Sequence, residues 1–240
     1  MTVLSAWLLL AKFITSSIAS LRRLAAPYCA VCAVDRGDPI CTGCLRDFLD
    51  PSCARCAVCA ARLPAGLPVA RCGRCVTAAP AFDATIVLGD YAPPLDGMVM
   101  ALKAGGRLDL ARVFAELLAC RLRTPIDCLL AVPLGRRRQR ARGFNQSLEI
   151  ATVMARRLRV PLAGHLVVRT HCGPPQQSLP LHERRANVRG AFELCGSLPG
   201  RRVALVDDVM TSGATLEELA RVVKSVGAVH VLNLVVARTE

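Results

Sequence analysis

The sequence predicts an α/β fold with a parallel sheet, preceded by a smaller cysteine-rich module. Beyond residue 79, short apolar runs alternate with amphipathic stretches, the pattern of strands and helices that share a parallel sheet. Before that point, cysteines recur in pairs separated by two residues. A chain of 240 residues is long enough for one medium domain and one small module. We therefore expect an N-terminal helix over 1–26, the cysteine module over 27–78 and the α/β domain over 79–240.

The N-terminal segment is apolar but lacks the layout of a secretory signal. No positive charge precedes its apolar run, Lys12 interrupts the run, and Arg22 and Arg23 follow it. The run is also too short and too interrupted to span a bilayer, so no transmembrane segment is expected. Its apolar residues fall mostly on one helical face, which predicts an amphipathic helix docked on the body, with attachment to a membrane surface as the alternative. We expect a cytoplasmic protein.

Eight of the 13 cysteines form four Cys-x2-Cys pairs. Each pair can turn two thiolates toward one metal ion, and two pairs complete a closed tetrahedral site, so we predict structural Zn²⁺ in a double zinc ribbon. Disulfides are the alternative, but they require an oxidising compartment that the N-terminus does not support. Cys53 could replace a ligand of the second ion. The simplest assignment gives Cys29, Cys32, Cys41 and Cys44 one ion and Cys56, Cys59, Cys72 and Cys75 the other.

The α/β domain is predicted element by element from its apolar pattern. A basic run at 135–143 is interpreted as a loop that leads into a helix, and a polar stretch at 170–187 as a mobile lid over the site. The expected strands are 85–88, 128–132, 166–168, 203–206 and 229–236, and the expected helices are 95–102, 108–122, 145–159 and 216–226.

The segment 203–215 is the most informative part of the chain. Its four apolar residues predict a buried strand, and Asp207 and Asp208 end that strand where open α/β sheets bind ligands. The small residues that follow let backbone N–H groups converge on an anion at a helix N-terminus. Because carboxylates repel a phosphate, we expect them to accept hydrogen bonds from an attached sugar, directly or through Mg²⁺ and its waters.

This segment resembles the phosphoribosyl pyrophosphate (PRPP) signature of type I phosphoribosyltransferases. The resemblance implies a type I phosphoribosyltransferase-like (PRTase) domain, with Asp207 and Asp208 facing the ribose hydroxyls and 211–215 around the 5′-phosphate. In 6-oxopurine salvage enzymes an Asp stands where this chain has Thr211, and a hydroxyl is a poor proton acceptor, so such salvage is not expected. The implied PRPP-binding residues are Asp207, Asp208, Val209, Met210, Thr211, Ser212, Gly213, Ala214 and Thr215.

Basic side chains outnumber acidic ones, 31 to 18, and the net charge of +13 suits an anionic partner without choosing among nucleic acid, polyphosphate and a membrane surface. Five arginines between 135 and 143 follow a predicted strand on the ligand side of the sheet, where guanidinium groups suit pyrophosphate oxygens. Lys103 and Arg107 could approach the same pyrophosphate. An exposed basic loop is the alternative for any single arginine.

A more specific likeness extends from Cys29 to Arg238. The run Arg142-Gly-Phe-Asn-Gln146, a later block containing Arg184 and Asn187, and the signature occur in the order found in the ComF family, also called GntX-like. That family carries a double zinc ribbon on a PRTase-like domain. The resemblance implies a link to competence, to the handling of incoming single-stranded DNA, or to the use of DNA as a nutrient.

Three functional hypotheses follow. In the first, the protein is a PRPP-dependent glycosyltransferase with an unknown acceptor, in which Asp207 and Asp208 position the ribose while Mg²⁺, Arg142 and Lys103 stabilise the departing pyrophosphate. In the second, a non-catalytic factor binds PRPP or a nucleotide as a signal and holds single-stranded DNA or the DNA-uptake machinery. An aromatic content of 4% argues against extensive base stacking there. In the third, the protein is a structural adaptor with a vestigial pocket.

Overall fold

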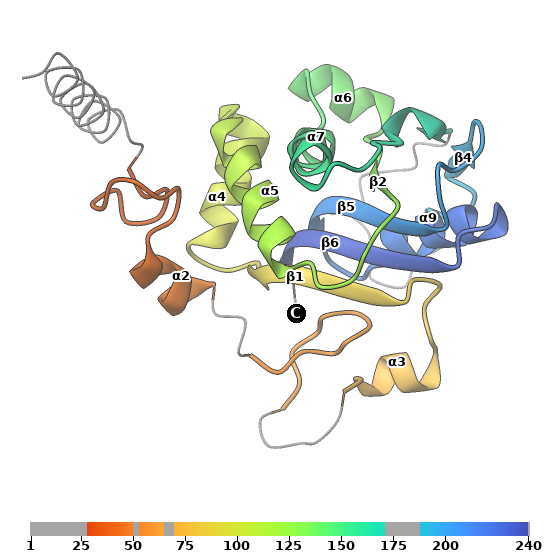
Figure 1. The fold of residues 1–240 in the computed structure, drawn as a ribbon, viewed down its shortest axis with the longest axis horizontal. Helices are drawn as coiled ribbons and strands as arrows, with labels where there is room; N and C mark the ends of the chain where they lie inside the picture. The colour runs from red at the N-terminus through yellow and green to blue at the C-terminus, as the bar shows by residue number, and fades with distance from the viewer. Residues whose placement is uncertain (1–27, 50–52, 65–69, 171–187, 240) are drawn as a thin grey trace, which may run out of the picture. The chain divides into compact units, whose positions relative to one another are not determined.

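The computed structural model describes residues 28–49, 53–64, 70–170 and 188–239 (Figure 1). Contacts divide the chain into two compact units, Met1–Phe48 and Leu49–Glu240. The helix predicted over 1–26 and most of the polar stretch at 170–187 lie outside the described residues. Within the described ranges, no helix is both long and apolar enough to cross a membrane.

The described part of the smaller unit is a cysteine-rich loop followed by a short helix, α2 (Thr42–Phe48). The loop is closed by backbone hydrogen bonds from the Cys29 N–H to the Asp35 carbonyl, at 2.7 Å, and from the Ala33 N–H to the Cys29 carbonyl, at 3.0 Å. Cys44 lies on the buried side of α2. The first two cysteine pairs thus belong to one small folded segment.

The larger unit is built on a four-stranded sheet in the order β1-β6-β5-β2, in which every pair is parallel. The two central strands are almost continuously apolar because both of their faces are covered. This confirms the predicted parallel α/β fold. The strands are β1 (Ala84–Asp90), β2 (Cys128–Ala131), β5 (Arg202–Met210) and β6 (His230–Arg238).

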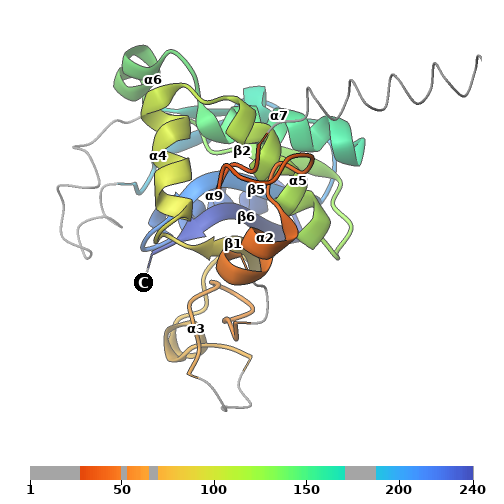
Figure 2. The same cartoon turned by 90° about the vertical axis from the view of Figure 1, so that its left-hand side faces the viewer.

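Three helices cover one face of this sheet, and Figures 1 and 2 show them gathered on the same side. They are α4 (Leu95–Gly105), α5 (Asp109–Arg121) and α7 (Gln146–Leu158). Their bounds agree with the predicted helices to within a few residues. Asn145 caps α7 by accepting a hydrogen bond from the Ser147 N–H at 3.1 Å, which fixes the start of that helix.

The other face is covered by α9 (Ala214–Ser225) together with the second cysteine module, which contains α3 (Gly73–Thr77). Alternating residues of β5, such as Val203 and Leu205, share one apolar cluster with Leu219 of α9. Cys56 and Val58 belong to the same cluster. The second cysteine module is therefore part of the core of the larger unit.

The structure differs from the sequence-based expectations in three places. First, β5 does not end at the two carboxylates, because its neighbour β6 pairs with it as far as Met210. Second, the basic run is not a loop but a helix, α6 (Arg136–Arg142). Arginine favours helices, and Gly143 ends this one in a left-handed conformation at φ +78°. Third, the strand expected at 166–168 forms as β3 (Val167–Arg169) but pairs antiparallel with β4 (Phe192–Leu194), outside the main sheet.

Candidate functional site

A pocket of about 210 Å³ opens at the carboxyl edge of the sheet, where β2 and β5 end. Open parallel sheets bind ligands at this edge because the loops that follow the strands converge there. The pocket takes Lys103 from α4, two arginines from α6 and residues 207–216 from the end of β5, the following turn and the start of α9. Parts of the chain more than 100 positions apart thus meet in one cavity.

The turn between β5 and α9 has the geometry of an anion cradle. Gly213 adopts φ +80°, a left-handed conformation that strains any other residue, and a Cβ atom at this position would lie 2.6 Å from the terminal Cε of Met210, which would have to shift. The Ser212 hydroxyl accepts a hydrogen bond from the Ala214 N–H at 3.3 Å and tightens the turn. The first N–H groups of α9 begin directly after it, and they bring the partial positive charge of a helix N-terminus to the pocket.

The two carboxylates have different partners. Asp207 Oδ1 accepts hydrogen bonds from the Ser147 hydroxyl at 3.1 Å and from the Asp208 N–H at 2.9 Å. Asp208 Oδ2 forms an ion pair with Lys103 Nζ at 3.0 Å, and both side chains are about 15% exposed. Burial, and then the negative charge of Asp208, raise the pKa of Asp207 to about 7. Asp207 therefore exchanges its proton near neutral pH.

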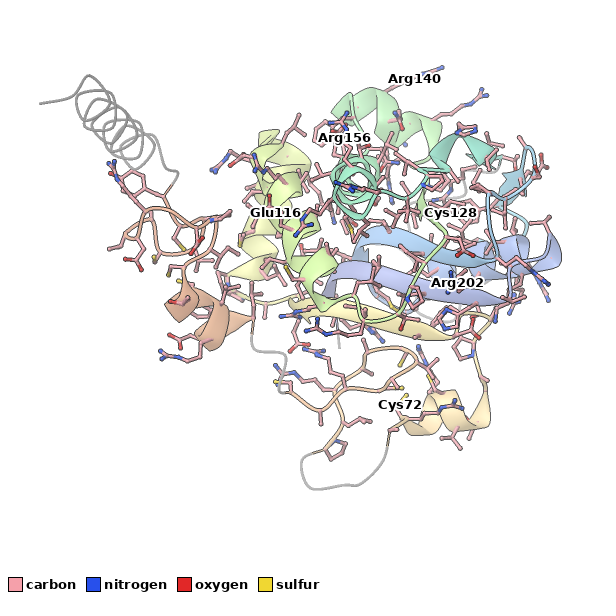
Figure 3. All side chains as sticks on the ribbon, viewed as in Figure 1. Cys72, Glu116, Cys128, Arg140, Arg156 and Arg202 are labelled. Carbon is pink, nitrogen blue, oxygen red and sulfur yellow. The ribbon has the colours of Figure 1, made fainter. Side chains whose placement is uncertain are left out.

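The arginines of α6 divide between two faces of the helix. Arg138 and Arg142, four residues apart on one face, line the pocket. Arg136, Arg137 and Arg140 are exposed, and Figure 3 shows Arg140 pointing away from the sheet. The expectation of a loop is therefore wrong. The helix places Arg138 and Arg142, of these five arginines, where they can reach a ligand in the pocket.

Of the other basic residues considered from sequence, Lys103 is in the pocket, whereas Arg107 is paired with Asp109 at 2.6 Å on the surface. Arg184 and Asn187 lie outside the described residues. Sequence reasoning missed Ser147, which contacts Asp207, and Tyr91 and Arg169, which also line the pocket. Of these three residues, only Ser147 could have been suspected from the sequence, because it directly follows the Asn145-Gln146 pair at the start of α7.

The eight paired cysteines gather into two groups of four, and within each group all four Sγ atoms lie within 4.8 Å of one another. Figure 3 shows Cys72 of the second group beside α3. Cys53 is exposed and belongs to neither group, and none of the described cysteines forms a disulfide. The first cluster is Cys29, Cys32, Cys41 and Cys44, and the second cluster is Cys56, Cys59, Cys72 and Cys75.

The protonation of these thiols fits metal ligation. Burial raises the pKa of Cys56, but N–H groups of Cys59, Cys72 and Val58 outweigh it and bring the pKa to about 6. The same balance, with other N–H donors, brings the pKa of Cys29 to about 6. Each cluster therefore holds one thiolate readily, whereas four thiolates this close repel one another unless a cation lies between them.

Burial and the neighbouring thiols act in the opposite direction on one member of each cluster. They raise the pKa of Cys44 to about 12 and raise that of Cys75 as well. A metal ion removes this opposition by accepting all four thiolates. Both clusters could bind metal ions and are compatible with zinc ribbons.

Comparisons with known proteins agree with this architecture. Residues 145–238 match the family model described as the phosphoribosyl transferase domain. The DNA utilization protein YhgH of Escherichia coli K12 is 33% identical over 187 residues, 72% of this chain and 82% of that protein. The relative of the same name in Salmonella typhi is 34% identical over 185 residues, 74% of this chain and 82% of that protein.

Competence protein F of Haemophilus influenzae is 33% identical over 168 residues, which cover 65% of this chain and 73% of that protein. Fold, pocket and family model together define a phosphoribosyltransferase-type domain that carries two four-cysteine clusters. The chain belongs to the ComF/GntX family, as the resemblance of its motifs implied.

Proposed function

We propose that the pocket binds PRPP together with Mg²⁺, and that the protein serves the uptake or use of DNA. The observation that carries the proposal is the meeting of an acidic pair, an anion cradle and four basic side chains in one cavity at the carboxyl edge of the sheet. The names of the relatives, which refer to competence and DNA utilization, support the link to DNA.

Each group in the pocket has a task that its chemistry allows. Asp207 and Asp208 accept hydrogen bonds from the two ribose hydroxyls, and residues 211–215 bind the 5′-phosphate through N–H groups and hydroxyls. Lys103, Arg138 and Arg142 face the pyrophosphate, where their charges stabilise its oxygens. When bound, Mg²⁺ supplies neutralising charge to the same pyrophosphate.

As a transferase, the protein would exchange pyrophosphate for a nucleophilic acceptor at C1′ of the ribose. The bond from C1′ to the pyrophosphate oxygen breaks as the bond to the acceptor forms, through a transition state with oxocarbenium character. Lys103 and Arg142 stabilise the charge that develops on the leaving group. Ser147 keeps Asp207 oriented toward the sugar.

The two cysteine clusters would each hold one structural Zn²⁺, with Cys53 outside both ligand sets. Cysteines that hold zinc and form no disulfide suit a reducing compartment, and we place the protein in the cytoplasm on that ground. The segments proposed for the chain remain 1–26, 27–78 and 79–240.

A second candidate function is a non-catalytic one, in which the pocket senses PRPP or a nucleotide and the protein holds single-stranded DNA. The observation that favours it is the outer face of α6, where Arg136, Arg137 and Arg140 are exposed next to the pocket. Such a row suits the phosphates of a strand, and its affinity would fall steeply with salt.

The first test is titration calorimetry of PRPP with and without Mg²⁺. We expect binding that needs Mg²⁺ and is lost in the double variant Asp207→Asn/Asp208→Asn. Tight binding by the double variant would refute the ribose assignment, and no binding by the wild type would refute the proposed ligand. Pyrophosphate release with bases or nucleic acids as acceptors then separates the transferase from the sensor, since only the transferase releases it.

A further inference from the structure

Hydrogen bonds link the second cysteine module to the turn between β5 and α9 (residues 211–213), which we call the phosphate-binding turn. Arg238, at the end of β6, is 7% exposed, and its guanidinium joins the two parts. Its Nε donates a hydrogen bond to the Cys59 carbonyl at 3.1 Å. Its Nη1 donates to the carbonyls of Met210, at 3.2 Å, and Thr211. One buried cation thus links a metal-ligand residue to the turn that follows β5.

A second arginine makes a parallel link. Arg74 lies on α3 between Cys72 and Cys75, and its Nη2 donates to the Ser212 carbonyl at 3.3 Å. Because Arg74 is exposed, this bond contributes less than those of the buried Arg238. The two arginines nevertheless bind consecutive carbonyls of the turn, those of Thr211 and Ser212, from the side of the cysteine module.

These carbonyl bonds determine where the N–H groups point. In a planar trans peptide the C=O of one residue and the N–H of the next point in opposite directions. Holding the Thr211 and Ser212 carbonyls toward the module therefore directs the N–H groups of Ser212 and Gly213 away from it. Charged donors on the carbonyls also polarise these peptides and strengthen the N–H groups as donors to an anion.

The packing beneath the turn leads to the same conclusion. Phe82 is 3% exposed and belongs to one apolar cluster with Cys56, Cys59 and Met210. The Cβ position of Gly213 is 3.9 Å from the Phe82 ring and 2.6 Å from the Met210 side chain, so the turn rests directly on this cluster. A shift of the cysteine module would be transmitted to the turn, since a close-packed core does not absorb it.

Arg238 gives this coupling an energetic reason. Arg238 is 7% exposed, and keeping its charge away from water has a cost in free energy. That cost is offset only while the carbonyls of Cys59, Met210, Thr211 and Thr239 all accept its hydrogen bonds. If the Cys59 segment moves, a buried cation loses one acceptor and its hold on the turn weakens.

We propose that a metal ion in the second cluster orders the phosphate-binding turn, with Arg238 and Arg74 as the positioning residues that transmit its effect. Loss of that ion lowers the affinity of the pocket for a phosphorylated ribose. The proposal is specific to the second cluster, because the hydrogen bonds of Arg238 and Arg74 connect the turn to Cys59 and to α3 of that module. The affinity part rests on the proposed function, whereas the ordering of the turn does not.

The experiment compares the full-length wild type with Cys75→Ser, in the second cluster, and the matched variant Cys44→Ser, in the first. Zinc content and hydrogen exchange of peptides covering 208–215 are measured in each. We expect exchange of these amides to accelerate roughly tenfold or more in Cys75→Ser and to stay at the wild-type rate in Cys44→Ser. Equal exchange in all three proteins would overturn the proposal.

Because Cys75→Ser could unfold the larger unit, Arg238→Met tests the same link with all cysteines in place. Its matched control is Arg202→Met, which removes an exposed arginine paired with Asp127 at the opposite end of β5. We expect Arg238→Met to keep both zinc ions and the exchange pattern of α7 while the turn exchanges faster. A turn that stays as protected as in Arg202→Met overturns the role of Arg238.

The affinity part is tested by calorimetry with PRPP and Mg²⁺ on the same proteins. We expect binding to weaken roughly tenfold or more in Arg238→Met and to be unchanged in Arg202→Met. Coupling is reciprocal, so PRPP with Mg²⁺ should also raise the affinity of the second cluster for zinc, measured by equilibrium competition with a chelator. If the wild type binds no PRPP, the proposed function fails and hydrogen exchange still decides this inference. If the wild type binds but Arg238→Met binds equally well, the inference alone fails.

Discussion

The two cysteine clusters have the same four ligands in the same paired spacing, yet their surroundings differ. The first cluster belongs to the smaller unit, and its Cys32 is exposed. In the second cluster Cys56 and Cys59 are each 1% exposed and belong to the apolar core under the sheet. The same four cysteine ligands can therefore organise a small separate module or form part of the core of a larger domain.

Polar contacts reinforce this difference. The Thr85 hydroxyl of β1 donates to the Val58 carbonyl at 2.6 Å, inside the second cluster's loop. Asp90, at the end of β1, forms ion pairs with Arg55, at 2.8 Å, and with Arg62. The second module is therefore joined to β1 by a hydrogen bond and by ion pairs, and a metal ion bound there would stabilise more than its own loop.

The largest effect is expected on unfolding. Cys75→Ser should lower the free energy of unfolding of the larger unit by several kcal/mol, because it removes a structural ligand and a buried anchor at once. Cys44→Ser should leave that unit within about 0.5 kcal/mol of the wild type. Urea unfolding followed by circular dichroism measures both, and equal losses would remove the distinction between the clusters.

The next effect is on the rate of metal loss. We expect a chelator to remove zinc from the first cluster at least about ten times faster than from the second, because the second opens only when part of the domain core opens. Release is followed with a chromogenic chelator. Variants that lack one cluster assign the two phases, and a single common rate would contradict the prediction.

A smaller effect is expected from Asp90→Asn. Although burial raises the pKa of Asp90, Arg62 and Arg55 outweigh it and lower the pKa below its usual range. The contribution of this carboxylate is therefore complete above about pH 4 and is lost as the pH falls through its folded-state pKa. The variant should lower the free energy of unfolding of the larger unit by about 1–2 kcal/mol, because it removes the ion pairs of a partly exposed carboxylate. It should also speed zinc loss from the second cluster and not from the first.

The smallest effect is a pH dependence of ligand affinity that arises in the pocket and does not involve either cysteine cluster. With its raised pKa of about 7, Asp207 is partly protonated at neutral pH, and a ligand that needs the ionised carboxylate must displace that proton. Affinity for PRPP with Mg²⁺ should rise about tenfold in total between pH 6 and 8, which corresponds to about 1.4 kcal/mol. Calorimetry in two buffers of different ionisation enthalpy measures the released proton. Asp207→Asn should abolish the release and retain both zinc ions.

Much of the fold was predictable because its signals are local. Apolar runs located the four strands of the sheet, and the spacing of the cysteines indicated two four-ligand clusters. The basic run was misread as a loop because five arginines carry no apolar face, whereas arginine itself favours a helix. The three-residue strands β3 and β4 were too short for their pattern to show how they pair.

The sequence alone determined the class of protein: the acidic pair, the glycine turn and the paired cysteines are contiguous motifs whose chemistry depends on near neighbours. Only the tertiary structure decided which distant groups meet them. Lys103 reaches Asp208, Ser147 reaches Asp207, and Arg238 joins Cys59 to the turn after β5. The physical reason is that parallel strands require long crossovers, so residues that meet at the edge of the sheet lie far apart in the chain.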